Sequence, residues 1–409
     1  MISKTDSEKL NSLLTQLEAI KVKGTLDGEK ADRRENLHRL FMYPAMMVPA
    51  TQSAIIEAVT HVLPKNSNAI DPFMGSGTSL LSCMEFGFNT FGQDINPFAV
   101  LLSKAKITCY DLDGFKHSLQ SIEDHIKNDS KTSIDVDFAT INKWFNKDIQ
   151  IALSKIRRAI IAESNSDYRI FFWVIMSEAI RIGSNDRTST FKLHARSQED
   201  IQKRNVNIIE EFLKFCTRSI EDLSNYRKKL QEEHLLNGHN YSGFSQVVWG
   251  NTQKKIEADT TFDVLVSSPP YGDNHTTVTY GQNSFLPLQW IDPKDIVCPY
   301  NYLKTAQEID RQSLGGKIDK NSLSQAFSKL FMKSPTLAKF YNSVPDADKE
   351  KYRKTVSFIA DFDESLDAIM KVMKHDAFYI WTIGNRFVGG REIPNSEILI
   401  DLMENRGVP

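Results

Sequence analysis

Two short segments of the chain carry residue types suited to chemistry on a bound ligand. The first spans Asp71–Thr78 and reads DPFMGSGT, and the second spans Ser268–Tyr271 and reads SPPY. Each follows an apolar run with the composition of a buried strand, where α/β proteins build their sites. The first is typical of a loop for a nucleotide-like cofactor, and the second of a pocket for a flat base with an exocyclic amine. Together they predict methyl transfer to an amino group of a nucleic acid.

The glycine-rich segment favours a cofactor with a single nucleoside. Gly75 and Gly77 let the backbone approach a ligand without Cβ clashes. The third glycine of the dinucleotide fingerprint is absent, and so is the Gly-Lys-Ser/Thr ending of a P-loop. Without the strand and helix expected on either side, two glycines would indicate no more than a turn.

Acidic residues beside this loop predict what it holds. Asp94 ends the next expected strand, where a carboxylate can accept hydrogen bonds from both hydroxyls of a ribose. Asp71, on the opposite lip of the loop, is expected to neutralise a cationic amino group. Phe73 is expected either to pack against the cofactor or to join the core. S-Adenosyl-L-methionine, an adenosine with a charged amino-acid tail, fits these groups better than a dinucleotide does.

The SPPY segment has the chemistry to present an amine to an electrophile. Pro269 and Pro270 fix φ and lack N–H groups, so the local backbone is rich in carbonyl acceptors. Ser268 Oγ and the Pro269 carbonyl can accept the amine hydrogens, and Tyr271 offers a flat face for an extruded base. The amine attacks the methyl group itself, so no covalent nucleophile is required. Taken alone, the segment would be read as a rigid turn with a buried tyrosine.

Composition is that of an ordinary globular protein. The 409 residues are 41% hydrophobic and carry a net charge of −2. This charge does not indicate a nucleic-acid partner, because compact DNA-binding modules are often clearly basic. It does not exclude one, because a large enzyme can confine its basic groups to one cleft. Cys83, Cys109, Cys216 and Cys298 lack paired spacing, which argues against disulfides or a zinc site and favours a reducing cytoplasm. We therefore expect no metal. We also expect no membrane segment, because the apolar stretches are too short or too interrupted to span a bilayer.

The order of expected elements predicts an α/β fold. Strand, turn, helix and strand alternate over 68–106, which favours a mostly parallel, doubly wound sheet covered by helices. We divide the chain into an N-terminal arm or cap (1–37), a first half of the α/β domain (38–110), a helical insertion (111–240) and a second half (241–409) with a polar helical insert near 291–354. Within the insertion, helices are expected at 144–161, 168–182 and 197–236.

Several stretches resemble the amino-methylating DNA methyltransferases of bacterial restriction–modification systems, specifically the SPPY type that methylates cytosine N4. Residues 71–78 resemble the family's D-P-F-x-G-x-G-T cofactor motif, and 92–97 its G-x-D-I-N-P motif. Tyr43, Pro44 and Ala45, with Pro49, resemble the stretch that closes over the methionine end of the cofactor. Residues 248–251 resemble the third-strand motif, with Asn251 where an acid often stands beside the adenine. The resemblance covers about half of the chain, in pieces at 38–106, 246–290 and 375–400.

The resemblance implies a Rossmann-like fold dependent on S-adenosyl-L-methionine, double-stranded DNA as substrate, a flipped cytosine, and a cognate restriction endonuclease as partner. Adenine N6 or RNA remains an alternative target, and a non-catalytic DNA-binding or regulatory subunit an alternative role. Family members usually continue the sheet with a closing hairpin after the helix near 395–405. We therefore expect either a fragment or a second chain that completes the sheet.

Three basic or polar stretches are candidates for DNA contact. For each of them the alternative is a helical face that is exposed to solvent and binds nothing. The first holds Arg181, Arg187, Lys192 and Arg196, interleaved with Ser, Thr and Asn near 183–196. The second holds the lysines and arginines of 143–158. The third is the segment 276–333, which follows the SPPY motif and is rich in Thr, Asn, Gln and Lys.

Overall fold

The computed structural model describes residues 4–22, 35–274, 276–316 and 323–408. Its centre is a sheet of five strands in the order β5-β2-β1-β6-β7, and every neighbouring pair is parallel. The strands are β1 (Asn68–Asp71), β2 (Asn89–Asp94), β5 (Ser245–Trp249), β6 (Phe262–Ser267) and β7 (Met373–Trp381). This arrangement confirms the predicted α/β class. β5 and β7 form the two edges, and their completion by a second chain stays a prediction.

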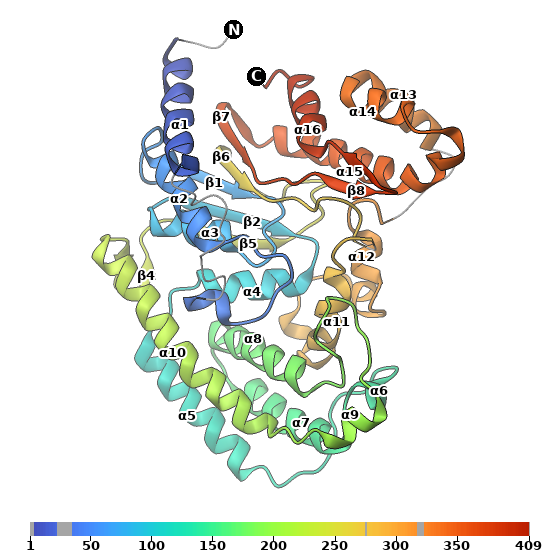
Figure 1. The fold of residues 1–409 in the computed structure, drawn as a ribbon. Helices are drawn as coiled ribbons and strands as arrows, with labels where there is room; N and C mark the ends of the chain where they lie inside the picture. The colour runs from blue at the N-terminus through green and yellow to red at the C-terminus, as the bar shows by residue number, and fades with distance from the viewer. Residues whose placement is uncertain (1–3, 23–34, 275, 317–322, 409) are drawn as a thin grey trace.

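Alternating side chains of the central strands pack on two helical layers, as the pleat of a strand requires. Ala69, Val264 and Val266 join one buried cluster with residues of α1 (Lys4–Val22), α2 (Pro49–Thr60) and α3 (Thr78–Glu85). Their neighbours Ile70 and Leu265 join another with α15 (Arg353–Met370) and α16 (Asn395–Glu404). Figure 1 shows these helices on opposite sides of the sheet. The expected arm therefore begins with a helix that packs on α2, while its residues 23–34 lie outside the described part.

The helical insertion forms a separate layer beyond α4 (Pro97–Ile107), as Figure 1 shows. Its long helices are α5 (Leu112–Asn128), α7 (Lys147–Ala162), α8 (Ser166–Gly183) and α10 (Ile208–Glu232). Phe172 and Trp173 of α8 are fully buried. One helix expected over 197–236 is in fact two, α9 (Gln198–Lys203) and α10, because the side chain of Asn207 accepts the Glu210 N–H and starts a new helix there.

The remaining elements lie mostly in the second half of the chain. α2 begins at Pro49 after Val48, since proline is well suited to a first helical position. The elements not yet given are η2 (Asn36–Arg39), α6 (Ile141–Trp144), β3 (Leu236–Asn237), β4 (Asn240–Tyr241), α11 (Tyr280–Trp290), η3 (Pro293–Asp295), η4 (Tyr300–Leu303), α12 (Glu308–Gln312), α13 (Leu323–Lys333), α14 (Pro335–Asn342), η5 (Asp346–Tyr352), β8 (Arg386–Val388) and β9 (Arg391–Ile393).

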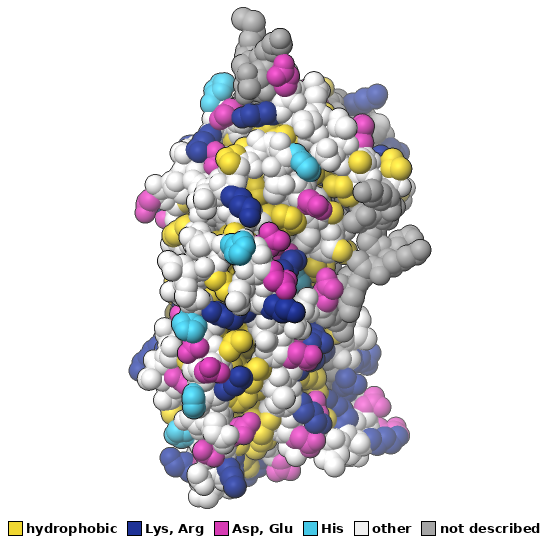
Figure 2. Space-filling view, turned by 90° about the vertical axis from the view of Figure 1, so that its left-hand side faces the viewer, with side chains coloured by type: hydrophobic (Ala, Val, Ile, Leu, Met, Phe, Trp, Pro, Cys, Tyr) yellow, Lys and Arg dark blue, Asp and Glu magenta, His cyan; other side chains and the backbone are white. Residues whose placement is uncertain are grey.

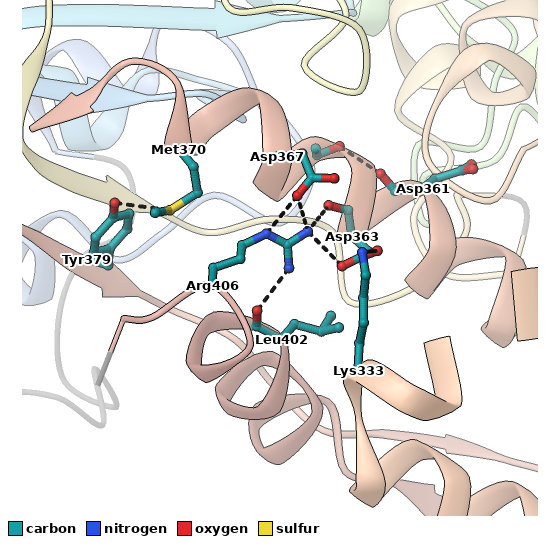
Figure 3. Close-up of polar contacts among 9 residues, drawn as sticks. Lys333, Asp361, Asp363, Asp367, Met370, Tyr379, Leu402 and Arg406 are labelled. Atoms are coloured by element: carbon teal, nitrogen blue, oxygen red, sulfur yellow. Dashed lines mark hydrogen bonds and ion pairs between the residues drawn. The ribbon is translucent and has the colours of Figure 1, made fainter. Parts of the chain in front are cut away.

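A cluster of paired charges ties α16 to α15 (Figure 3). Arg406 Nη2 lies 2.7 Å from Asp363 Oδ1, and Arg406 Nε lies 2.9 Å from Asp367 Oδ1. Lys333 Nζ lies 2.5 Å from the other oxygen of Asp363. Arg406 also donates to the Leu402 carbonyl at 2.9 Å. We call these four charged residues the Arg406 cluster; every carboxylate in it has a cationic partner.

In the described residues, no helix has both the length and the apolar character needed to cross a membrane.

Candidate active site at the carboxyl edge of the sheet

The carboxyl ends of the central strands open into one pocket, as expected for an open parallel sheet. Its empty space is about 860 Å³, open solvent included. Both motifs predicted from the sequence contribute to its wall, although they lie almost 200 residues apart. Of the predicted site residues, eight line it: Tyr43, Phe73, Gly75, Thr78, Asp94, Asn251, Ser268 and Pro270. Five do not: Pro44, Asp71, Gly77, Pro269 and Tyr271.

The glycine loop is held open by backbone geometry and by α4. Gly75 and Gly77 have φ of +50° and +74°, which other residues rarely adopt. A Cβ on Gly77 would lie 2.8 Å from Ser103 Oγ, so Gly77 shapes the loop without lining the pocket. Ser103 Oγ donates to the Gly75 carbonyl at 3.0 Å, and the buried Lys106 Nζ donates to the Ser76 carbonyl at 2.8 Å. Burial lowers the pKa of Lys106 to about 7.

Asp94 lies at the pocket wall beside this loop, as its place at the end of β2 requires. Its Oδ2 accepts the Gly75 N–H at 2.8 Å, and its Oδ1 accepts the Asn96 N–H at 2.8 Å. Burial raises the pKa of this carboxyl to about 6. Each oxygen keeps a further lone pair, so the carboxylate can still accept hydrogen bonds from a ligand hydroxyl.

Asp71 does not occupy the position expected for it. Its side chain is fully buried behind the pocket wall. Ser267 Oγ donates to Oδ1 at 2.7 Å, the Phe73 N–H donates to the same oxygen at 3.1 Å, and Ser79 Oγ donates to Oδ2. Burial raises its pKa to about 6. A side chain in this position does not reach the pocket, so it does not fit the expected contact with a cationic amino group. Asp71 instead joins the end of β1 to the end of β6, and so holds the glycine loop and the SPPY motif next to each other.

The segment after η2 supplies a second wall. Tyr43 is 5% exposed and stacks on Tyr280 of α11, with 5.7 Å between ring centroids. Asn96 Nδ2 donates to the Tyr43 hydroxyl at 3.2 Å. Pro44 is buried outside the pocket, whereas the next residues, Ala45, Met46 and Met47, line it. Phe73 lines the pocket and also packs on Phe362, so its ring joins the core, and its contact with a cofactor stays a prediction.

The SPPY motif forms the rim of the pocket. Ser268 and Pro270 line it, and Pro269 is buried beneath. Tyr271 is 38% exposed, with its hydroxyl 3.4 Å from Ser268 Oγ. A Cβ on Gly384 would lie 3.1 Å from the Tyr271 ring, so glycine is what lets this backbone pass the ring. Because Tyr271 is exposed, the alternative of a turn around a buried tyrosine does not describe this segment.

Sequence reasoning missed several pocket residues. Tyr280, Asn274 and Gln253 line the pocket, as do Ile309 and Gln312 of α12. Asn274 follows the SPPY motif closely, and this proximity is the one signal that could have pointed to it. The residues of α12 carry no such signal, because only tertiary packing brings this helix to the pocket.

Two of the predicted DNA-contacting cations are exposed close to the pocket. Arg187 and Lys192 lie on a hairpin-like loop closed by a bridge between Asp186 and Ala195. The loop is attached to the start of α11, where Thr279 Oγ1 donates to the Phe191 carbonyl at 2.9 Å. This attachment places the loop next to the pocket wall that carries Tyr280. We call residues 185–196 the basic loop.

Other candidate cations are engaged within the fold. Arg181, predicted to contact DNA, instead pairs with Glu178 one helical turn away, at 2.6 Å. Arg196 is half-buried and donates to the Arg187 carbonyl at 3.2 Å. In the second candidate stretch, Arg158 bonds to Asp129 and to a further aspartate, Asp135, at 2.6 and 2.7 Å. On the face shown in Figure 2, Lys and Arg are interspersed with Asp and Glu and form no patch of one sign.

No group of three or more His, Cys, Asp or Glu side chains suited to a metal ion occurs in the described residues. None of the four cysteines lines the pocket, and burial raises the pKa of the Cys109 and Cys298 thiols to about 11. The pocket therefore offers backbone, hydroxyl, amide and carboxylate groups, which can bind and orient a ligand.

Two curated proteins resemble the chain. It is 34% identical over 390 residues to type II methyltransferase M.MvaI of Kocuria varians, and this match covers 92% of the chain and 82% of that protein. It is also 34% identical over 111 residues to type II methyltransferase M.MjaII of Methanocaldococcus jannaschii, covering 26% of the chain and 20% of that protein. No family model and no solved structure matches.

Proposed function

Because the chain belongs to the type II methyltransferases, we propose that it transfers a methyl group from S-adenosyl-L-methionine to N4 of a flipped cytosine in double-stranded DNA. It would act as the modification enzyme of a restriction–modification system, in the cytoplasm and beside a cognate endonuclease. The observation that carries this proposal is a single pocket lined both by the glycine loop and by the SPPY motif. The reaction needs a donor and an acceptor within reach of each other, and these two segments are suited to one each.

The pocket residues fit S-adenosyl-L-methionine. Gly75 allows close backbone approach, Asp94 can accept hydrogen bonds from the ribose hydroxyls, and Asn251, which lines the pocket, would lie beside the adenine. Tyr43 and its neighbours would close over the methionine end. When bound, S-adenosyl-L-methionine supplies an electrophilic methyl group on a sulfonium centre.

The chain's own contribution is to orient the amine and exclude water. Ser268 Oγ and the Pro269 carbonyl would accept the two amine hydrogens, which directs the nitrogen lone pair toward the methyl carbon. Tyr271, exposed at the rim, would stack on the extruded base. The nitrogen–methyl bond would form as the carbon–sulfur bond breaks and leaves a neutral thioether, and the methylated amine would pass its proton to solvent at the open rim. Alignment and desolvation account for such a step without a covalent nucleophile.

DNA would approach from the side of the basic loop. Arg187 and Lys192 are exposed there, and the loop is bonded to the start of α11 beside the pocket. Cations on phosphates fix the register of a duplex, which would bring one base to the SPPY rim.

Transfer of a tritiated methyl group to DNA, followed by nucleoside analysis, tests the proposal. We expect N4-methylcytosine as the product, and a loss of about 100-fold in rate for Ser268→Ala, since removing one positioned polar group at a reacting centre has effects of this order. N6-methyladenine as the sole product would overturn the choice of base. Absence of S-adenosyl-L-methionine binding in calorimetry, with DNA present, would instead favour a non-catalytic subunit.

A further inference from the structure

One wall of the pocket contains a buried polar atom without a partner. Asn274 lines the pocket and is 3% exposed, yet its Oδ1 has no hydrogen-bond partner in the described part of the chain. Asp310 of α12 is fully buried behind it, beside the backbone N–H groups of Gly281 and Gln282. Buried acceptors are nearly always satisfied, because an unmade hydrogen bond is costly. The Asn274 oxygen therefore points to a ligand that donates to this wall.

The hydrogen bonds of Asp310 fix which way Asn274 faces. Asp310 Oδ1 accepts the Gly281 N–H at 2.9 Å, at the start of α11, where Thr279 provides no side-chain cap. The same oxygen accepts Asn274 Nδ2 at 3.2 Å. A carboxylate can only accept, so the amide must turn its nitrogen toward Asp310. The oxygen of Asn274 is then the polar atom left to meet a ligand.

Asp310 is also an anion without a cation. No lysine or arginine of the described residues forms an ion pair with it, and its hydrogen bonds come from Asn274, Gly281 and Gln282. A buried, uncompensated carboxylate favours a positively charged ligand over a neutral one. Among the ligand groups that could donate a hydrogen bond to this wall, the negative charge of Asp310 therefore favours a cationic one.

The position of this wall identifies the end of the cofactor it would meet. Tyr280 precedes Gly281 and stacks on Tyr43. A Cβ on Gly75 would lie 3.5 Å from the Tyr43 ring, so the wall continues directly onto the glycine loop. Tyr43 begins the stretch proposed to close over the methionine end. Asp71, the residue expected to serve the amino group there, is buried outside the pocket.

We propose that Asn274 Oδ1 binds the α-ammonium group of the cofactor's methionine moiety, with Asp310 as the positioning residue that orients the amide and supplies the opposite charge. The inference rests on S-adenosyl-L-methionine being the cofactor, as in the proposed function. The exocyclic amine of the base is the other donor that could enter the pocket. It is neutral, and Ser268 and Pro269 are proposed to provide its two acceptors, so the charge of Asp310 favours the ammonium group.

Calorimetry with three ligands tests this assignment. S-Adenosyl-L-methionine and S-adenosyl-L-homocysteine carry the ammonium group, whereas 5′-methylthioadenosine lacks the whole amino-acid tail. Asn274→Leu should weaken binding of the first two by about tenfold, as expected for a lost hydrogen bond to a charged group, and leave the third unchanged within about twofold. Asn283→Leu is a matched control, because Asn283 also has a buried Oδ1 without a partner but lies outside the pocket. It should change none of the three affinities.

Asp310→Asn provides a second, independent variant. It retains an acceptor for the Gly281 N–H but removes the charge, so it should raise the KM for S-adenosyl-L-methionine about tenfold while kcat at saturating cofactor changes less than twofold. A purely structural role would weaken all three ligands alike and lower the melting temperature, which would contradict the assignment. Unchanged cofactor affinities in Asn274→Leu, with a fall in kcat/KM for DNA, would also overturn it and place Asn274 at the base. If the wild-type chain bound none of the ligands, the proposed function itself would fail.

Discussion

The aspartates of the Arg406 cluster and those at or directly behind the pocket wall are surrounded in opposite ways. Asp363 and Asp367 are neutralised by Arg406 and Lys333 at distances of 2.5 to 2.9 Å (Figure 3). Asp71, Asp94 and Asp310 have hydrogen bonds but no ion pair with any described residue, and burial raises the pKa of each carboxyl to about 6. The carboxylates of the first set are therefore neutralised by side chains of the folded chain itself.

The difference shows what each region is built for. A paired cluster binds two helices together, and removing a partner leaves a charge uncompensated. The second set holds carboxylates that accept hydrogen bonds within the fold but are not neutralised by any described cation, which lowers stability but suits a cationic ligand. The two regions should therefore respond to mutation in opposite ways: the first in stability, the second in binding.

The largest expected effect is on stability. Arg406→Ala should lower the free energy of unfolding by about 2 to 3 kcal/mol, because it leaves Asp367 without its cation and removes contacts to α15. Arg391→Ala, which removes an exposed arginine bonded to the Ser343 carbonyl, should cost less than about 0.5 kcal/mol. Urea unfolding measures both. A variant of Arg406 that bound S-adenosyl-L-methionine tenfold more weakly yet unfolded normally would contradict the separation of the two regions.

Asp94→Asn should have the converse result. We expect affinity for S-adenosyl-L-methionine to fall about tenfold, since a neutral amide is a weaker acceptor for ribose hydroxyls than a carboxylate. The melting temperature should fall by only a few degrees, because the amide loses one of the two backbone hydrogen bonds of Asp94 but also removes a buried charge whose ionisation opposes folding above pH 6. Calorimetry and thermal unfolding of the same preparation provide the two readouts. A destabilised variant with unchanged affinity would reverse the interpretation.

A change of pH should separate binding from folding within the pocket. Lowering the pH from 7.5 to 5.5 protonates Asp94 and Asp310, whose pKa values are raised to about 6, and should weaken S-adenosyl-L-methionine binding several-fold. The folded state holds these protons more tightly than the unfolded chain, so the same groups favour folding as the pH falls from about 6 toward 4. Asp71 and Asp361 shift in the same direction. Affinity that does not vary over this range would contradict the role assigned to the pocket carboxylates.

The smallest expected effects lie on the basic loop. Arg187→Ala and Lys192→Ala should each weaken DNA binding about threefold at physiological salt and reduce the salt dependence, as the loss of single phosphate contacts does. Arg181→Ala should leave the salt dependence unchanged, because that side chain is paired with Glu178. Fluorescence anisotropy over a range of salt concentrations compares the three. Equal salt slopes for all of them would remove the basic loop from the DNA interface.

The local part of the site could be predicted from the sequence, and the tertiary part could not. The strand, glycine turn and helix around Gly75 were expected within a residue or two, since turn chemistry and periodicity are local signals. Asp71 was misassigned because its partner Ser267 lies on another strand, and only the pairing of β1 with β6 brings them together. The contact between Asn274 and Asp310 likewise depends on where α12 packs.

Arg181 is a different case, because its ion pair with Glu178 makes it a weaker candidate for DNA contact than the sequence suggested. Glu178 precedes it by three residues on a helix that was expected, and this spacing places the two side chains on one face. The pairing could therefore have been anticipated from helical periodicity. Charged side chains that already have a partner at such a spacing are poor candidates for a nucleic-acid contact.

Methylome sequencing of a host that expresses the chain is the sharpest test of cytosine-N4 methylation, because it reports base, position and sequence context together. We expect N4-methylcytosine at one recurring sequence with the wild-type chain and none with Ser268→Ala. New N6-methyladenine alone, or unmodified DNA from a host that makes the folded wild-type protein, would contradict this expectation.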